Sequence, residues 1–154
     1  MKLFQIEEPE GGPSDPDAPG AAIGVDVSAG YAEVALSIGG NAVVLADREG
    51  FERPLPVPSI AAVAGEWQTL LEGARLRAER ALGRPVTHAT VVLGVTAAAR
   101  RIREAAERSG LEVMRFVAVS ELPAGMPPVL TAAVLAEDLA PRPDLGTVPG
   151  ADLT

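Results

Sequence analysis

The sequence predicts an α/β domain with a mixed five-stranded sheet and about three helices, for three reasons. Residues 21–45 contain an apolar run and two alternating segments, which is typical of an antiparallel three-strand meander. Two amphipathic segments then alternate with two apolar runs, as in strand–helix–strand units with parallel strands. A last apolar, alanine-rich segment follows. The predicted elements are strands 21–27, 31–38, 42–46, 89–95 and 111–119 and helices 66–82, 97–109 and 129–139.

The meander is predicted from its apolar pattern and its turns. Residues 21–27 are almost continuously apolar, as in a strand covered on both faces. Residues 31–38 alternate, and Gly39-Gly40-Asn41 predicts a hairpin turn before 42–46. Residues 51–60 contain three prolines at alternate positions. Because proline cannot donate to a β-ladder, this segment is predicted to be an extended edge or a loop.

Local signals set the helix boundaries. Gly83 and Pro85 follow the first helix, in which Trp67 is predicted to be the core anchor. Thr96 is predicted to cap the second helix, which Gly110 ends. The last helix is apolar almost all round, so we expect it to pack against the sheet or a partner. His88 is predicted to lie at the surface before the fourth strand.

Composition excludes several classes of function. The chain has 154 residues, enough for one domain, and its formal net charge of −8 argues against binding nucleic acid or anionic membranes. It has no cysteine and one histidine, which argues against thiolate chemistry and histidine-based metal sites. No signal peptide or membrane-spanning run is evident, so the predicted location is the cytoplasm. Residues 1–20 are predicted to be a disordered acidic arm and 142–154 a flexible tail.

The turn after the first strand is the candidate functional site. Asp26 ends the apolar run, and Ser28-Ala29-Gly30 follows. Small residues let a backbone approach a phosphate closely and leave its amides free, so this turn can hold a phosphate or its metal ion. It can equally be a plain hairpin turn.

Three segments together resemble the first lobe of the ATPase domain of heat-shock protein 70 (DnaK-type) chaperones. They are IGVDVSAGYAEVAL (23–36), ERPLPVPSI (52–60) and LGRPVTHATVVLGVTAAARRIREAAERSGLEVMRFVAVSELPAG (82–125). A weaker fourth match, PPVLTAAVLAEDLAP (127–141), is similar to the helix that closes the family's ATPase domain. The resemblance covers about 21–141 in family order. It implies the ribonuclease-H-like fold of the actin-like ATPases.

The resemblance also implies what this chain lacks. The second lobe, its glycine-rich phosphate loop, the catalytic lysine and the substrate-binding domain have no counterpart. The family's loop glycine and threonines align with Ser28, Ala29 and Gly30, so the hydroxyls that meet phosphate and metal are lost. Two site residues remain by position: Asp26, which in the family lies near the metal, and Glu121, which is implicated there in hydrolysis and coupling.

From this resemblance we expect a non-catalytic, chaperone-related binding or regulatory module that acts through a protein partner or self-association. We expect no ATP hydrolysis, cofactor or metal, with Asp26 and Glu121 as remnants. The alternative is a reduced ATP-binding protein that holds Mg-ATP or Mg-ADP at 26–30 and completes its site with a partner or second copy.

The charged residues allow two further interpretations. A metal nuclease would use Asp26, Glu33, Asp47 and Glu121 as candidate ligands. The acidic composition and the expected placement of Glu33 and Asp47 away from Asp26 argue against it. The arginines within 100–108 could meet an acidic partner, but interleaved glutamates favour a solvated helix face.

Overall fold

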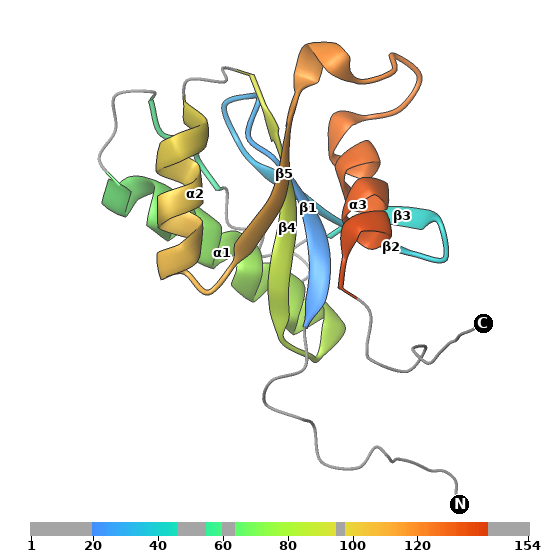
Figure 1. Cartoon of the computed structure of the whole chain (residues 1–154), viewed down its shortest axis with the longest axis horizontal. Coiled ribbons are helices and arrows are strands. Elements are labelled where there is room, and N and C mark those ends of the chain that lie inside the picture. The colour runs from blue at the N-terminus through green and yellow to red at the C-terminus, as the bar shows by residue number, and fades with distance from the viewer. Residues whose placement is uncertain (1–19, 46–54, 60–63, 95–97, 142–154) are drawn as a thin grey trace, which may run out of the picture. The chain divides into compact units, whose positions relative to one another are not determined.

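A mixed five-stranded sheet with strand order β3-β2-β1-β4-β5 forms the centre of the fold (Figure 1). The computed structural model describes residues 20–45, 55–59, 64–94 and 98–141. Within them, β1–β2 and β2–β3 pair antiparallel, whereas β1–β4 and β4–β5 pair parallel. The predicted mixed sheet with a starting meander is confirmed. The strands are β1 (Ala21–Asp26), β2 (Glu33–Ile38), β3 (Asn41–Val44), β4 (Val86–Leu93) and β5 (Glu112–Ala118).

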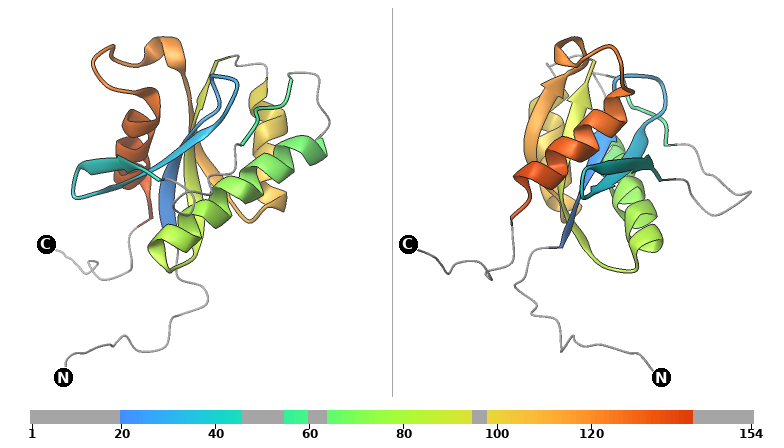
Figure 2. Two further views of the ribbon diagram at one scale, coloured as in Figure 1. Left: turned by 180° about the vertical axis from the view of Figure 1, so that it is seen from behind. Right: turned by 90° about the vertical axis from the view of Figure 1, so that its right-hand side faces the viewer.

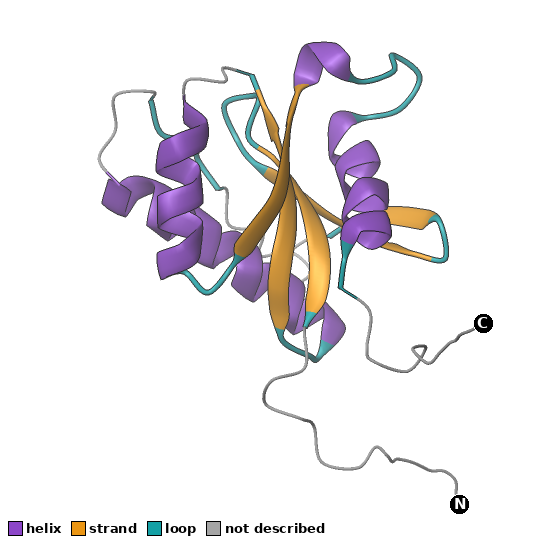
Figure 3. Cartoon of the chain, viewed as in Figure 1, coloured by secondary structure: helices purple, strands orange, loops and turns teal. Residues whose placement is uncertain are grey.

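Helices cover both faces of the sheet, which gives three layers (Figures 2 and 3). Helices α1 (Ala64–Leu82) and α2 (Ala99–Arg108) pack on one face, and α3 (Pro128–Leu139) packs on the other. A short 3-10 helix, η2 (Val119–Glu121), follows β5. The expectation that the last helix packs against the sheet is confirmed.

The larger core lies between the sheet and helices α1 and α2. Trp67 is its aromatic anchor, as predicted, and only 2% of its surface is exposed. The core under α3 is built from small residues, Ala35, Val129 and Ala133 among them. Gly24 lets this helix approach closely, since a Cβ built there would lie 2.4 Å from the backbone nitrogen of Ala133. Small residues therefore set the spacing between α3 and β1.

Strand β4 begins three residues earlier than predicted, and this changes the position of His88. Val86 is buried and pairs with Ala21 across the parallel β1–β4 ladder. His88 therefore lies within the strand, with 12% of its side chain exposed, and contacts Thr87 and Glu112. The prediction of a surface residue before the strand was wrong because the polar residues Thr87 and His88 interrupt the apolar run that the sequence analysis took as the strand.

The β2–β3 turn is shorter than predicted. Gly39 and Gly40 have positive φ angles of 60° and 86°, which fit a two-residue hairpin turn. Asn41 therefore belongs to β3 and pairs with Ile38. The register follows from this turn and fixes which side chains of the hairpin share a face.

Several predictions fall wholly or partly outside the described residues. Thr96, the predicted cap of the second helix, is one of them, and the residue that precedes α2 in the structure is Ala98, which makes no side-chain cap. The tail 142–154 and the arm are others, except Gly20, whose backbone nitrogen donates to Thr87 Oγ1 at 2.8 Å.

Candidate functional site

Asp26 ends β1 at the carboxyl edge of the parallel strands, and its carboxylate is hydrogen-bonded within the loop that follows. Oδ1 accepts hydrogen bonds from the backbone nitrogen of Ser28 at 2.8 Å and from its hydroxyl at 2.6 Å. The side chain of Asp26 is buried, with 6% exposed. This is a local turn in which a carboxylate satisfies the two donors that follow it.

The remaining loop residues lie at the surface beside the proline-rich segment. Ala29 and Gly30 are exposed, and Ser28 is partly buried. The Gly30 carbonyl accepts from the backbone nitrogen of Val57 at 2.9 Å, and Ala32 donates to Leu55 at 2.8 Å. The extended segment 55–57 therefore supports the loop from one side, as predicted for a proline-rich edge.

Glu121 lies at the same edge of the sheet but in a separate local structure. It ends η2, is exposed, and accepts from the backbone nitrogen of Ala118 at 3.1 Å. Strand β4 lies between the strands that lead to Asp26 and Glu121. β1 and β5 are two strand spacings, about 10 Å, apart. The structure therefore places the two predicted residues along one edge without joining them in one hydrogen-bonded site.

Glu33 lies opposite Asp26, contrary to the sequence-based expectation. The antiparallel register pairs Asp26 directly with Glu33. Residues paired in this way point to the same face, with Cβ atoms about 5 Å apart. The prediction failed because the register of β1 and β2 depends on where pairing resumes after the loop, which periodicity alone does not give. Asp47 lies outside the described residues.

The helix dipole of α3 favours negative charge at this same end of the sheet. Glu137, near the end of α3, contacts the β2–β3 turn, so the amino end of α3 points toward the end of the sheet that holds Asp26 and Glu33. The positive end of a helix dipole stabilises carboxylates within about one turn. Among the described residues, no group of three or more acidic or histidine side chains is arranged to hold a metal ion.

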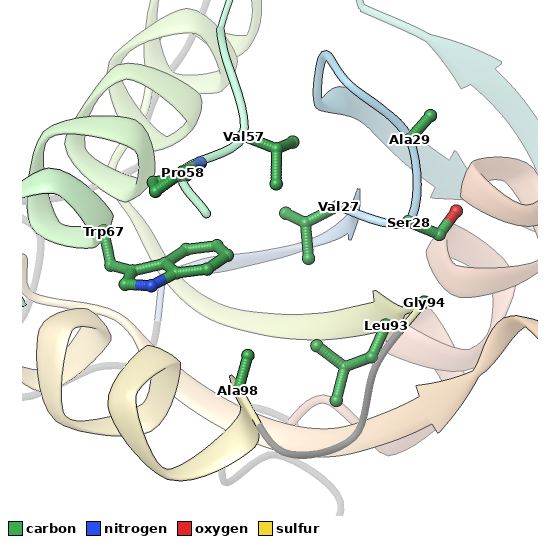
Figure 4. A pocket seen from close by; sticks show the side chains of 9 residues that line it. All are labelled: Val27, Ser28, Ala29, Val57, Pro58, Trp67, Leu93, Gly94 and Ala98. Atoms are coloured by element: carbon green, nitrogen blue, oxygen red, sulfur yellow. The ribbon is translucent and has the colours of Figure 1, made fainter. Parts of the chain in front are cut away.

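A cavity of about 270 Å³ lies on the other face of the sheet, below the same loop (Figure 4). Ser28 and Ala29 border it from the loop, and Gly94 borders it from the end of β4. Its walls are otherwise apolar and come from the carboxyl ends of the β1 and β4 segments, α1, the start of α2 and the proline-rich segment. They are Val27, Val57, Pro58, Trp67, Leu93 and Ala98.

Two features of this region were not predicted from the sequence. Glu137 accepts hydrogen bonds from Ser37 Oγ and from the backbone nitrogens of Gly39 and Gly40. The indole Nε1 of Trp67 is buried and has no hydrogen-bond partner. The acidic pair Glu137-Asp138 in an otherwise apolar helix was a usable signal for the first feature, but no sequence pattern predicts the second.

Comparison with protein-family models and with curated protein sequences finds no significant match for this chain. Within the described part of the chain, no helix combines the length and the apolar character needed to cross a bilayer.

Proposed function

We propose that this chain is a non-catalytic, chaperone-related binding or regulatory module of ribonuclease-H-like topology. The sheet order β3-β2-β1-β4-β5, with an antiparallel meander and two parallel crossovers, supports this topology. The sequence resemblance to the first lobe of a heat-shock protein 70 ATPase supports the chaperone relation. A cytoplasmic location without nucleic-acid partners belongs to the same proposal.

The hydrogen bonding of the Asp26 carboxylate is the observation that carries the non-catalytic proposal. Oδ1 already accepts from both donors of Ser28, and Glu121 accepts from Ala118. Phosphoryl transfer needs several groups that neutralise charge together. The only lysine of the chain is Lys2, far in sequence from this loop. These residues therefore serve local structure.

The β2–β3 hairpin supports action through protein contacts, and a second copy is the partner that it fits. Ile38 and Val43 share the face that points away from α3 and are 67% and 52% exposed. β3 is the terminal strand of the sheet among the described residues and, like the hairpin turn, carries no charge or proline.

Edge strands that carry no charged residue or proline pair readily with another strand. Two identical antiparallel edges are self-complementary about a twofold axis. In a chain with a net charge of −8, this neutral surface also avoids the repulsion that two copies meet elsewhere.

The alternative function is a reduced nucleotide site, and one observation favours it. Asp26 and Glu33 are adjacent carboxylates on one face of the sheet and could together meet a magnesium ion of Mg-ATP or Mg-ADP. A partner or second copy would then supply the remaining phosphate contacts.

Calorimetric titration with Mg-ATP and Mg-ADP, with light scattering on the same sample, distinguishes these functions. The proposal predicts no nucleotide binding up to millimolar concentration, together with a self-associated protein. Micromolar binding that Asp26→Ala abolishes and Ser120→Ala retains would contradict it and establish the alternative. A protein that binds no nucleotide and stays monomeric at all concentrations would contradict the choice of partner.

A further inference from the structure

We infer that self-association joins two copies through their β3 strands, antiparallel about a twofold axis at Val43, and stops at two because the β5 edge of each copy is blocked. This inference rests on the self-association in the proposed function and adds its register and its limit. The β2–β3 hairpin projects from the side of the sheet, past α3, and β5 lies at the opposite end of the strand order (Figures 1 and 2).

The pairing of β3 with β2 decides which backbone groups of β3 face outward. The backbone nitrogen of Leu45 donates to the carbonyl of Val34 in β2 at 2.7 Å. Hydrogen-bonded and non-hydrogen-bonded pairs alternate along an antiparallel ladder, so Val43 also directs its amide and carbonyl toward β2. Ala42 and Val44 therefore direct theirs to the other side of β3, which is the open edge of the sheet among the described residues.

One register uses all of these outward groups. With the axis at Val43, Ala42 lies opposite the partner's Val44, and each of these residues can donate and accept across the interface. An axis at Ala42 would set Val44 opposite residue 40, which lies in the hairpin turn. An axis at Val44 would set Ala42 opposite residue 46, beyond the described part of the strand. The axis at Val43 therefore pairs the described edge most completely.

The side chains of the hairpin suit the same register. Val43 lies opposite the partner's Val43 in a non-hydrogen-bonded pair, in which side chains approach most closely. Val43 is exposed and shares its face with the exposed Ile38, so the axis gathers apolar side chains of both copies on this face. On the other face, Ala42 meets the partner's Val44. No residue of β3 is charged, so the two strands do not repel each other.

The β5 edge resists the same kind of pairing. Arg103 of α2 donates from Nη1 to the carbonyl oxygen of Val113 at 3.2 Å, and its guanidinium carbon lies 5.0 Å from the centre of the Phe116 ring. Glu112 and Arg115 add exposed charges to the strand. Charged side chains and cover from a helix both protect edge strands from pairing. A dimer joined through β3 leaves only β5 edges at its ends, so the assembly is closed.

Single cysteines test the register, because the chain has none of its own. Val43→Cys places two thiols across the axis with Cα atoms about 4.5 Å apart, within the range that a disulfide spans. In a glutathione redox buffer it should form a covalent dimer at least about tenfold faster than Leu76→Cys, because pairing raises the local thiol concentration. Leu76 is a similarly exposed residue of α1. Val44→Cys should be as slow as Leu76→Cys, since its diagonal counterpart lies about 7–8 Å away.

A mixed sample gives a second measurement of the register. Ala42→Cys and Val44→Cys should each fail to cross-link alone. An equal mixture of the two should form a covalent heterodimer, because the two positions lie opposite each other with Cα atoms about 5.5 Å apart. Sedimentation velocity of the wild type measures the limit of assembly, and we expect no species larger than two copies at any concentration.

The register, the limit and the choice of partner are contradicted by different results. A wild type that associates while Val43→Cys cross-links no faster than Leu76→Cys would overturn the register, and so would rapid cross-linking of Val44→Cys alone. Species larger than two copies would overturn the block at β5. A protein that stays monomeric and does not cross-link at Val43→Cys would overturn this inference together with the partner in the proposed function. Should Val43→Cys fail to fold, the mixture of Ala42→Cys and Val44→Cys decides the register.

Discussion

At the residue scale, Ser28 and Asp26 form a closed local unit. The serine donates twice to one carboxylate oxygen, which holds the turn and orients Asp26 below the surface. The family resemblance aligns Ser28 with a phosphate-binding residue, whereas in the structure its hydroxyl donates to the carboxylate of Asp26. The hydroxyl of Ser28 is therefore already engaged by the neighbouring Asp26 carboxylate.

Ser28→Ala tests this unit through stability. The change leaves the backbone donor in place and removes the shorter hydrogen bond to a buried carboxylate. The free energy of unfolding in urea should fall by about 1 kcal/mol. Ser120→Ala, at an exposed serine of η2, should change it by less than about 0.5 kcal/mol. Equal effects of the two changes would show that the serine–aspartate contact contributes nothing to the fold.

Gly24 provides a second test at this scale. A Cβ there would lie 2.4 Å from the backbone nitrogen of Ala133 and 2.7 Å from the carbonyl carbon of Ala132. Gly24→Ala should therefore push α3 away from β1 and cost about 2–3 kcal/mol of unfolding free energy. Gly30→Ala is the matched control, since a Cβ at Gly30 meets nothing within 4 Å. A tolerated Gly24→Ala would mean that α3 packs less closely than described.

The sequence predicted where the candidate site lies but not all of its members. The end of an apolar strand followed by small residues located Asp26 and the loop, because that signal is local. Glu33 was expected elsewhere, yet it pairs directly with Asp26. Its position depends on the register between β1 and β2, which is set by the number of loop residues left unpaired. Sequence spacing alone does not supply that number.

At the scale of elements, the side chain of Glu137 joins α3 to the β2–β3 turn. Glu137 accepts from Ser37 Oγ at 2.8 Å, from Gly39 at 2.6 Å and from Gly40 at 3.0 Å. The two glycine amides are free to donate because a two-residue turn with positive φ angles presents them outward. The contact joins residues almost a hundred positions apart and fixes the last helix against the hairpin.

Glu137→Ala should loosen this contact measurably. Three hydrogen bonds to one carboxylate are lost, and we expect a loss of about 2–3 kcal/mol in unfolding free energy. Hydrogen exchange at the Gly39 and Gly40 amides should speed up together with this loss. Asp138→Ala, the exposed neighbour, should leave both measurements near wild type. Unchanged hydrogen exchange at the Gly39 and Gly40 amides in Glu137→Ala would show that the hydrogen bonds of Glu137 do not hold the hairpin.

The element types were predictable because each strand and helix carries a local signal, either a period or an apolar run bounded by turn residues. The alternation of apolar residues predicted β2, and their helical spacing predicted α1. The apolar character of 129–139 predicted a helix that packs against the sheet. The boundaries were less accurate where tertiary pairing decides them. β4 gains Val86 and His88 because β1 continues alongside them, which no property of residues 86–88 reveals.

At the scale of the whole molecule, the helices cover the central strands but leave one side of the β2–β3 hairpin uncovered. Both faces of the central strands are covered, whereas the outward side of the hairpin is not. Exposed apolar side chains beside an uncharged edge are typical of a surface that meets another chain. The prediction that follows concerns association rather than stability.

Ile38→Asp should separate two associated copies. It places a charge on the exposed face of the hairpin in a chain that already carries a net charge of −8, so paired copies would repel. Leu76→Asp makes the same change at an apolar residue of α1 with 43% exposure and is expected to associate like the wild type. Circular dichroism of both variants checks that the fold is kept.

The most direct measurement of the central claim is sedimentation velocity of the wild type, Ile38→Asp and Leu76→Asp from micromolar to near-millimolar concentration. The account predicts a concentration-dependent dimer for the wild type and Leu76→Asp and a monomer for Ile38→Asp. A wild-type protein that remains monomeric throughout, or an Ile38→Asp variant that dimerises as the wild type does, would contradict it.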